Sequence, residues 1–186
     1  MINIHRYIEN TCVEGPGKRF AIWLQGCSRR CKGCYAVDTW SHDPQMLYDV
    51  NEFADMVNSI ETIEGITILG GEPFEQAEEL LNLIHLIRSE LSIILFTGFK
   101  LKDLEAMNDR CINEILDSID VLVDGKYDEQ VKDLSRPMVG SSNQEFIFLT
   151  DRYQYEDFPK NDIEIRVNKN GTVLINGNGR IESIIV

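Results

Sequence analysis

Three cysteines in one short segment are the residues of this chain whose type and spacing most clearly permit chemistry. Cys27, Cys31 and Cys34 follow one another as C-x-x-x-C-x-x-C. Three thiolates at this spacing can hold an iron–sulfur cluster, but a cubic cluster contains four irons and usually takes four cysteine ligands. One iron would therefore lack a protein ligand. As at catalytic zinc sites, the missing ligand leaves a coordination position for a small molecule.

That open position suits S-adenosylmethionine, whose amino and carboxylate groups can chelate an iron. Two other interpretations of the cysteines remain open at this point. A structural zinc would need a fourth ligand, and His42 is the histidine near enough in sequence to supply it. An iron–sulfur protein that only carries electrons would also need a fourth ligand.

Composition and charge limit the classes of protein to which the chain can belong. Its 186 residues, 43% hydrophobic and 26% charged, are typical of one soluble globular domain. The formal net charge of −13 disfavours non-specific binding to nucleic acid. The chain contains no apolar run of the ~20 residues needed to cross a bilayer and does not begin like a signal peptide. Five cysteines, three of them clustered, favour a reducing compartment, so we expect a cytoplasmic protein with no membrane or nucleic-acid partner.

Strand and helix patterns alternate along most of the chain. Short apolar runs that end at turn residues predict buried strands, and apolar residues at helical spacing predict the helices between them. Repeated strand–helix units with continuous apolar strands indicate a parallel sheet covered by helices. The predicted strands are residues 20–24, 65–69, 92–96, 119–123 and 146–149, and the predicted helices are residues 49–60, 74–90 and 101–116.

The number of these units determines the predicted fold class and domain boundary. A closed eight-fold barrel takes about 250 residues, so we predict an α/β fold with a partial, open β/α barrel over residues 1–150. Residues 163–167 and 172–175 have strand character on either side of an Asn-Gly turn. Residues 151–186 are therefore predicted to be a C-terminal extension that forms a short β-hairpin.

Residues suited to ligand binding follow the carboxyl ends of the predicted strands, the edge where parallel α/β sheets place their active sites. Paired glycines let a bare backbone approach a ligand, and their carbonyls can accept hydrogen bonds from an ammonium group such as that of S-adenosylmethionine. These loops are expected to build one pocket. Besides the cysteines they are Gly70-Gly71-Glu72-Pro73, Thr97-Gly98 and Asp124-Gly125-Lys126.

Together these motifs resemble those of radical S-adenosylmethionine enzymes, and most closely the anaerobic ribonucleoside-triphosphate reductase activating protein family of glycyl-radical enzyme activases. The sequence departs from the family at Ala36, where Asn is frequent, and from the wider superfamily at Gly33, where an aromatic residue is frequent. The similarity extends over residues 14–144 in the family's order. The matching segments are Glu14-Gly15-Pro16-Gly17, Gln25-Gly26-Cys27 to Cys34-Tyr35, Thr39-Trp40, Gly70-Gly71-Glu72-Pro73, Thr97-Gly98-Phe99-Lys100, residues 120–126, Leu134-Ser135 and Gly140-Ser141-Ser142-Asn143-Gln144.

The resemblance implies a reaction and a set of roles. Cys27, Cys31 and Cys34 would ligate three irons of a [4Fe–4S] cluster, and S-adenosylmethionine would bind the fourth. Reductive cleavage would give methionine and a deoxyadenosyl radical, which takes a hydrogen atom from a glycine Cα of the reductase large subunit. Flavodoxin or a similar protein would donate the electron. The cofactor supplies this chemistry, so no catalytic side chain is expected beyond the cluster and S-adenosylmethionine.

By the same resemblance, residues at the pocket edge are expected to bind the cofactor, and the polar loop over residues 126–144 to dock the partner. An alternative is a radical S-adenosylmethionine enzyme that acts on another glycyl-radical enzyme, a peptide or a small molecule. A remoter alternative is an iron–sulfur electron-transfer protein, which would have no use for the Gly-Gly-Glu-Pro turn. The expected cofactor-binding residues are Tyr35, Gly70, Gly71, Glu72, Thr97, Asp124 and Lys126.

Overall fold

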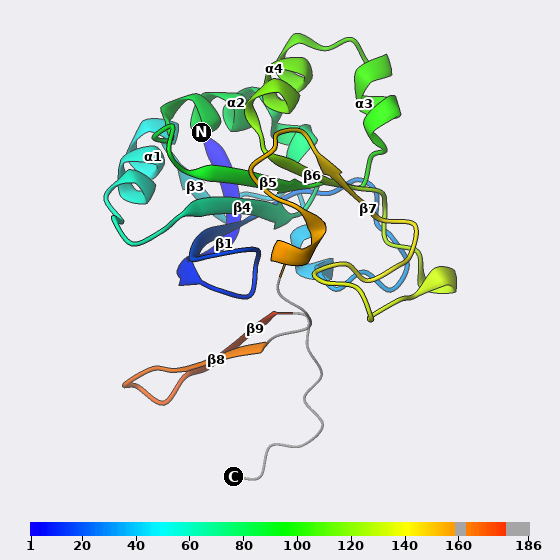
Figure 1. The fold of residues 1–186 in the computed structure, drawn as a ribbon. Coiled ribbons are helices and arrows are strands. Elements are labelled where there is room, and N and C mark those ends of the chain that lie inside the picture. Colours follow the sequence, from blue (N-terminus) through cyan, green and yellow to red (C-terminus); the bar gives the residue numbers. More distant parts are fainter. Residues whose placement is uncertain (159–162, 178–186) are drawn as a thin grey trace.

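The computed structural model describes residues 1–158 and 163–177, and its centre is a seven-stranded sheet with the order β3-β1-β2-β4-β5-β6-β7 (Figure 1). The strands at its two sides do not pair with each other, so the barrel is open, as predicted. Four neighbouring strands are parallel: β2 (Arg19–Leu24), β4 (Gly65–Gly70), β5 (Ser92–Phe96) and β6 (Val121–Asp124). Three strands pair antiparallel at the sides: β1 (Ile2–Thr11), β3 (Met46–Tyr48) and β7 (Glu145–Phe148).

The helices connect the parallel strands, and α1, α2 and α4 lie together on one side of the sheet (Figure 1). The Asp49 carboxylate accepts hydrogen bonds from the backbone N–H groups of Asn51 and Glu52, so Asp49 is the N-cap of α1. No helix in the described part of the chain is long and apolar enough to cross a membrane. The α-helices are α1 (Val50–Asn58), α2 (Ala77–Leu86), α3 (Leu101–Ala106) and α4 (Arg110–Ser118), and the short 3-10 helices are η1 (Val37–Thr39), η2 (Pro73–Gln76), η3 (Glu129–Val131) and η4 (Tyr155–Asp157).

Alternate residues of the parallel strands pack on opposite faces of the sheet. On β5, Ile93 and Leu95 belong to the core under the helices, whereas Ile94 faces the other side and packs with Val139 and Phe158. Segments that follow β6 in the chain therefore cover the face that the helices leave open. A sheet buried on both faces explains why its parallel strands are almost entirely apolar.

Two predicted helices differ from the observed elements. Residues 74–90 form a 3-10 turn and then α2, because Gln76 has a non-helical backbone between them (φ −126°, ψ 40°). Residues 101–116 form α3 and α4, separated at Asn108, whose φ is 49°. The strands β1 and β3 lie outside the prediction, because their mixture of polar and apolar residues does not stand out as an apolar run.

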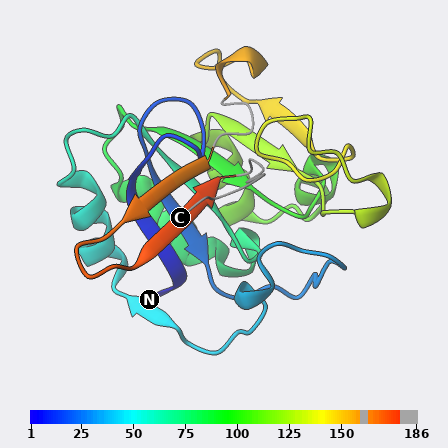
Figure 2. The same cartoon turned by 90° about the horizontal axis from the view of Figure 1, so that it is seen from below.

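The predicted C-terminal hairpin is present as β8 (Ile163–Val167) paired antiparallel with β9 (Val173–Gly177). Figure 2 shows it lying across the side of the sheet away from the helices. The domain boundary at residue 150 stays a prediction. Tyr153 and Phe158, just beyond that boundary, pack against the sheet.

Candidate functional site

The cysteine segment begins directly after β2, and hydrogen bonds hold the start of the segment in place. The Gln25 side chain contacts the His5 Nδ1 atom at 2.9 Å and donates to the Ser41 carbonyl at 2.6 Å. Gly26 turns the chain with a φ of 105°, and its N–H donates to the Thr39 carbonyl at 2.7 Å. The positive φ favours glycine at this position.

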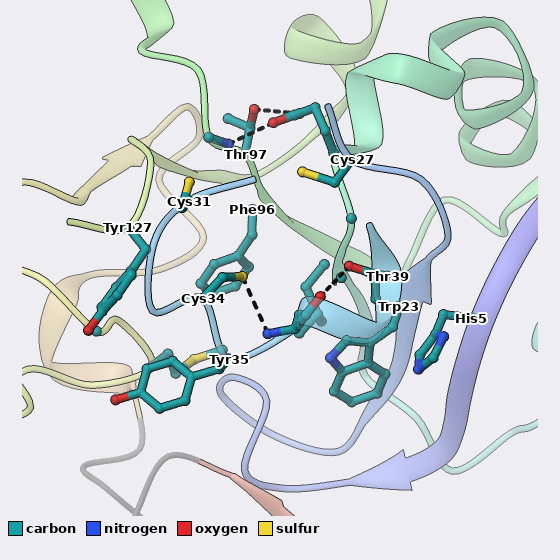
Figure 3. Close-up of a pocket in the computed structure, with 18 of the residues that line it drawn as sticks. His5, Trp23, Cys27, Cys31, Cys34, Tyr35, Thr39, Phe96, Thr97 and Tyr127 are labelled. Carbon is teal, nitrogen blue, oxygen red and sulfur yellow. Dashed lines mark hydrogen bonds between the residues drawn. The ribbon is translucent and has the colours of Figure 1, made fainter. Parts of the chain in front are cut away.

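A cavity of about 780 Å³ lies at the carboxyl ends of β2, β4, β5 and β6 and brings most of the predicted site residues together (Figure 3). Asp124 is the one predicted residue that does not line it, although its neighbour Gly125 does. The predicted residues at the wall are Cys27, Cys31, Cys34, Tyr35, Gly70, Gly71, Glu72, Thr97 and Lys126. The expectation that strand-end loops build one pocket is therefore met by the structure.

The three cysteines of the segment are free thiols. The Ala36 N–H donates to the Cys34 sulfur at 3.3 Å. Burial raises the pKa of the Cys27 and Cys31 thiols, while the positive charges of Arg29 and Lys126 act in the opposite direction on the Cys31 pKa. Nearby cations favour the thiolate, which is the form that binds iron.

Zinc fits this arrangement less well than a cluster. Within the described residues, no three His, Cys, Asp or Glu side chains are arranged to hold a single metal ion. The His42 Nε2 atom instead contacts a Glu75 carboxylate oxygen at 2.7 Å. A cubic cluster does not require convergence on one point, because each thiolate binds a different iron.

The Gly70-Gly71 turn packs against the start of the cysteine segment. The Gly71 N–H donates to the Leu24 carbonyl at 2.9 Å, and the Glu72 N–H donates to the Gly26 carbonyl at 2.8 Å. A Cβ atom at Gly71 would collide with the Gly26 carbonyl oxygen. Glycine is therefore required here for one backbone to approach another, and the contact fixes the turn relative to the cysteines.

Glu72 joins the ends of β4 and β5. Its carboxylate accepts hydrogen bonds from the Thr97 hydroxyl at 2.7 Å and from the Gly98 N–H at 2.9 Å. Burial raises the pKa of Glu72, and these hydrogen bonds act against that rise. Figure 3 shows this contact beside Cys27. The Thr97 hydroxyl and the Glu72 carboxylate thus pair with each other at the cavity wall.

The other predicted residues have different surroundings. The buried Asp124 carboxylate accepts hydrogen bonds from the Lys100 ammonium at 2.8 Å and from the Leu101 N–H at 2.9 Å, so it caps the start of α3. Lys126 is exposed at the cavity wall. Tyr35, 63% exposed, packs edge to face on Tyr127 with 5.6 Å between ring centroids. Their ligand-binding roles stay predictions.

Arg29 is a cavity residue that was not among the predicted site residues, although it is one of the basic residues around the cysteines that could compensate the charge of a cluster. Its guanidinium lies 4.0 Å above the centre of the Phe99 ring, and its side chain packs against Gly98. Its Nε atom is buried and has no hydrogen-bond partner among the described residues. A buried cationic donor without a partner, placed between Cys27 and Cys31, fits an anionic group with acceptor atoms such as an iron–sulfur cluster. Its place between two cysteines was the available sequence signal.

A second group missed by the sequence analysis lies at another part of the cavity wall. The Arg6 guanidinium stacks 3.9 Å above the Trp23 ring, and both residues line the cavity with Glu14. Burial raises the pKa of Glu14 to about 7, although the charge of Arg6 and a hydrogen bond from Asn176 act against the rise. Only the tertiary structure brings these side chains together.

Free cysteines at the strand-end edge of an open β/α sheet, beside an arginine whose buried Nε atom has no hydrogen-bond partner among the described residues, fit the class of single-cluster iron–sulfur domains. The family model described as "4Fe-4S single cluster domain" matches residues 13–147. The chain is also 33% identical over 152 residues to the anaerobic ribonucleoside-triphosphate reductase-activating protein of Escherichia coli K12. This alignment covers 77% of this chain and 96% of that protein. It is 32% identical over 159 residues to the protein of that name from Enterobacteria phage T4, covering 81% and 96%.

The protein of the same name from Vibrio cholerae is 33% identical over 152 residues, covering 77% of this chain and 96% of its own length. The chain thus belongs to the family of anaerobic ribonucleoside-triphosphate reductase-activating proteins. The curated relatives match over nearly their whole length, whereas about a quarter of this chain lies outside these alignments. The hairpin lies beyond residue 147, where the match to the cluster-domain model ends.

Proposed function

We propose that the protein is a radical S-adenosylmethionine activase that generates a glycyl radical on the anaerobic ribonucleoside-triphosphate reductase. The observation that carries the proposal is one cavity in which three free cysteines and the Gly70-Gly71 turn lie together. Membership of a family whose relatives are named for activating this reductase supports the choice of substrate. Another glycyl-radical enzyme, a peptide or a small molecule remains the alternative substrate.

The cysteines and their surroundings have the chemistry to hold a [4Fe–4S] cluster. Cys27, Cys31 and Cys34 would each provide one thiolate, and Arg29 would provide a positive charge and a hydrogen-bond donor beside them. When bound, the cluster supplies the electron that splits S-adenosylmethionine into methionine and a deoxyadenosyl radical able to take a hydrogen atom from glycine. No side chain has to act as an acid, base or nucleophile in this chemistry.

The remaining residues of the wall would bind and orient S-adenosylmethionine. Carbonyls of Gly70 and Gly71 are suited to its ammonium group, since the turn is held against the cysteine segment. Glu72 and Thr97 keep the two strand ends together, and Asp124 holds the start of α3. The Lys126 ammonium suits the methionine carboxylate, and the Tyr35 ring suits the adenine.

The partner and the setting follow from the same proposal. A glycine Cα has to enter the cavity, so the substrate is a polypeptide loop of the reductase large subunit. A flavodoxin or similar low-potential protein would deliver the electron, and the cytoplasm provides the reducing conditions that free cysteines require.

Anaerobic reconstitution with iron and sulfide tests the proposal. The wild-type protein is expected to take up about four irons per chain. With a reductant it should release methionine and deoxyadenosine in equal amounts, and with the reductase it should produce a glycyl signal in electron paramagnetic resonance. Cys31→Ala should lose the cluster absorbance and S-adenosylmethionine cleavage together, because one iron loses its thiolate.

Cys111→Ala is the matched control, since Cys111 is a free cysteine that lies outside the cavity. It should retain both the cluster and cleavage. Cleavage that persists in Cys31→Ala would show that the ligand assignment is wrong. A wild-type protein that binds a cluster but never cleaves S-adenosylmethionine would support the electron-transfer alternative instead.

A further inference from the structure

The C-terminal hairpin is attached to the body of the protein by one of its two faces. The Thr11 hydroxyl at the end of β1 donates to the Glu164 carboxylate at 2.7 Å and accepts a hydrogen bond from the Asn176 amide at 3.3 Å. Glu164 and Asn176 are directly paired across β8 and β9, so their side chains lie on the same face. That face is directed toward the sheet.

The opposite face of the hairpin is an exposed apolar ladder. It contains two cross-strand pairs, Ile165 with Ile175 and Val167 with Val173. These side chains are 50%, 47%, 73% and 52% exposed, respectively. Four β-branched side chains without a charge among them are unusual on the surface of a chain whose net charge is −13. Such exposed apolar patches commonly mark interaction sites.

The ladder continues into the rim of the cavity. Ile175 belongs to the ladder and also lines the cavity that contains the three cysteines. The next two residues of β9, Asn176 and Gly177, line the same cavity. A folded partner can bring a glycine Cα into this cavity only if the surface around that glycine rests on the rim. The hairpin forms part of this rim.

We propose that the apolar ladder of the β8–β9 hairpin is a docking surface for the reductase. Its occupant is an uncharged, apolar segment of the reductase large subunit next to the glycine that enters the cavity. This inference rests on the proposed function and adds to it the surface that selects the partner. Apolar contact suits this task, because the centres of protein interfaces are depleted of charge.

The hairpin lies beyond the matched family region, apart from the residues proposed to carry the chemistry. The match to the cluster-domain model ends at residue 147, before the hairpin begins. The cysteines and the Gly-Gly-Glu turn all lie within the matched region. The chemistry and the docking surface are thus carried by different parts of the chain, which permits an experiment that separates them.

The experiment uses the full-length, cluster-loaded protein with Val167→Ser and Val173→Ser combined. Neither residue of this cross-strand pair lines the cavity. The affinity for the reductase large subunit should fall at least about tenfold, as expected when central apolar contacts are lost. The yield of glycyl radical at limiting reductase should fall with it, while S-adenosylmethionine cleavage without reductase should stay unchanged.

Leu174→Ser is the matched control. Leu174 is 46% exposed on the same hairpin but lies on the opposite face, paired with Arg166. It should leave the affinity for the reductase unchanged. A second measurement does not depend on any variant: binding of the reductase to the wild-type protein should slow hydrogen exchange of the amides of residues 163–177.

Equal reductase affinity in the double variant and the wild type would overturn the inference, as would unchanged hydrogen exchange in the hairpin. A ladder that instead mediates self-association would give a wild-type oligomer that the double variant dissociates, with unaltered reductase affinity, and this result would also overturn it. Failure of the proposed function is distinguishable, because the wild-type protein would then produce no glycyl radical at all.

Discussion

Glu14 shows how burial changes the properties of a single side chain at the cavity wall. Only 9% of the residue is exposed, and its carboxyl group lies near Arg6 and Asn176. Burial disfavours the charged carboxylate and raises the pKa of Glu14 to about 7, despite the opposing effects of these two neighbours. The residue is therefore protonated in the folded protein over a pH range in which an exposed glutamate is ionised.

Glu14→Gln should change how the stability of the protein depends on pH. Because the folded-state pKa is raised above the ordinary value of 4.5, the unfolded chain ionises first, and wild-type stability falls as the pH rises from about 4.5 to 7. Gln cannot ionise and does not incur this loss. Relative to wild type, the variant should thus gain on the order of 3 kcal/mol in its free energy of unfolding between these pH values, with no further gain above pH 7.

Urea unfolding of the cluster-free protein under reducing conditions, at several pH values, measures this difference. Glu9→Gln removes the same charge from an exposed position on β1 and controls for the change in net charge. A Glu14→Gln difference that stays constant from pH 5 to pH 8 would contradict the effect assigned to burial.

At the scale of elements, the break between α3 and α4 depends on one residue. Asn108 adopts the left-handed conformation with a φ of 49°, and its side chain is exposed. Apolar residues continue at helical spacing across this position, so the sequence pattern predicts one helix over residues 101–116. Asn is among the few residues that tolerate this conformation, and the break directs α4 onto α2.

Asn108→Val should lower the free energy of unfolding by about 1–2 kcal/mol, because a β-branched side chain collides with the backbone in the left-handed conformation. Asn108→Gly should alter it by less than about 0.5 kcal/mol, since glycine adopts the same φ freely. Urea unfolding of both variants measures the effect. Equal stability of the two would mean that the helix break does not require a positive φ.

At the scale of the whole molecule, the sheet is stable only if both of its faces are covered. The helices cover one face, and residues that follow β6 cover the other. Phe158 is 2% exposed, and its ring packs against that of Phe146 with 4.8 Å between the ring centroids and an angle of 71° between the ring planes. The fully buried Arg19 lies on the same side and donates to the Thr67 hydroxyl at 2.6 Å and to the Ser92 hydroxyl at 2.9 Å.

Phe158→Ala should therefore destabilise the whole molecule rather than only the C-terminal extension. Loss of a buried aromatic ring from this core is expected to cost about 3–5 kcal/mol. The measurement is a urea transition followed by the fluorescence of Trp23 and Trp40, the two tryptophans of the chain, both of which precede residue 150. An unchanged fluorescence transition would mean that residues beyond 150 unfold independently, as a separate domain would.

Local residue types suffice to predict much of the architecture. The parallel strands and the C-terminal hairpin are found close to their predicted positions, because continuous apolar runs and the Asn-Gly turn are short-range signals. No such short-range signal predicts β1 or the break between α3 and α4 at Asn108. β1 pairs through its backbone with the next strand, β2, and with the more distant β3, and the conformation of Asn108 depends on how α4 packs.

The order and types of the residues alone determined the cysteine segment, the strand-end glycines and the alternation of strands and helices, since each depends on neighbours in the chain. Tertiary structure alone decided that Glu72 pairs with Thr97, that Asp124 faces α3 instead of the cavity, and that Arg29 has a buried donor without a partner. Burial and hydrogen-bond partners arise from contacts between distant segments. These contacts, and not the local pattern, determine what each polar side chain can do.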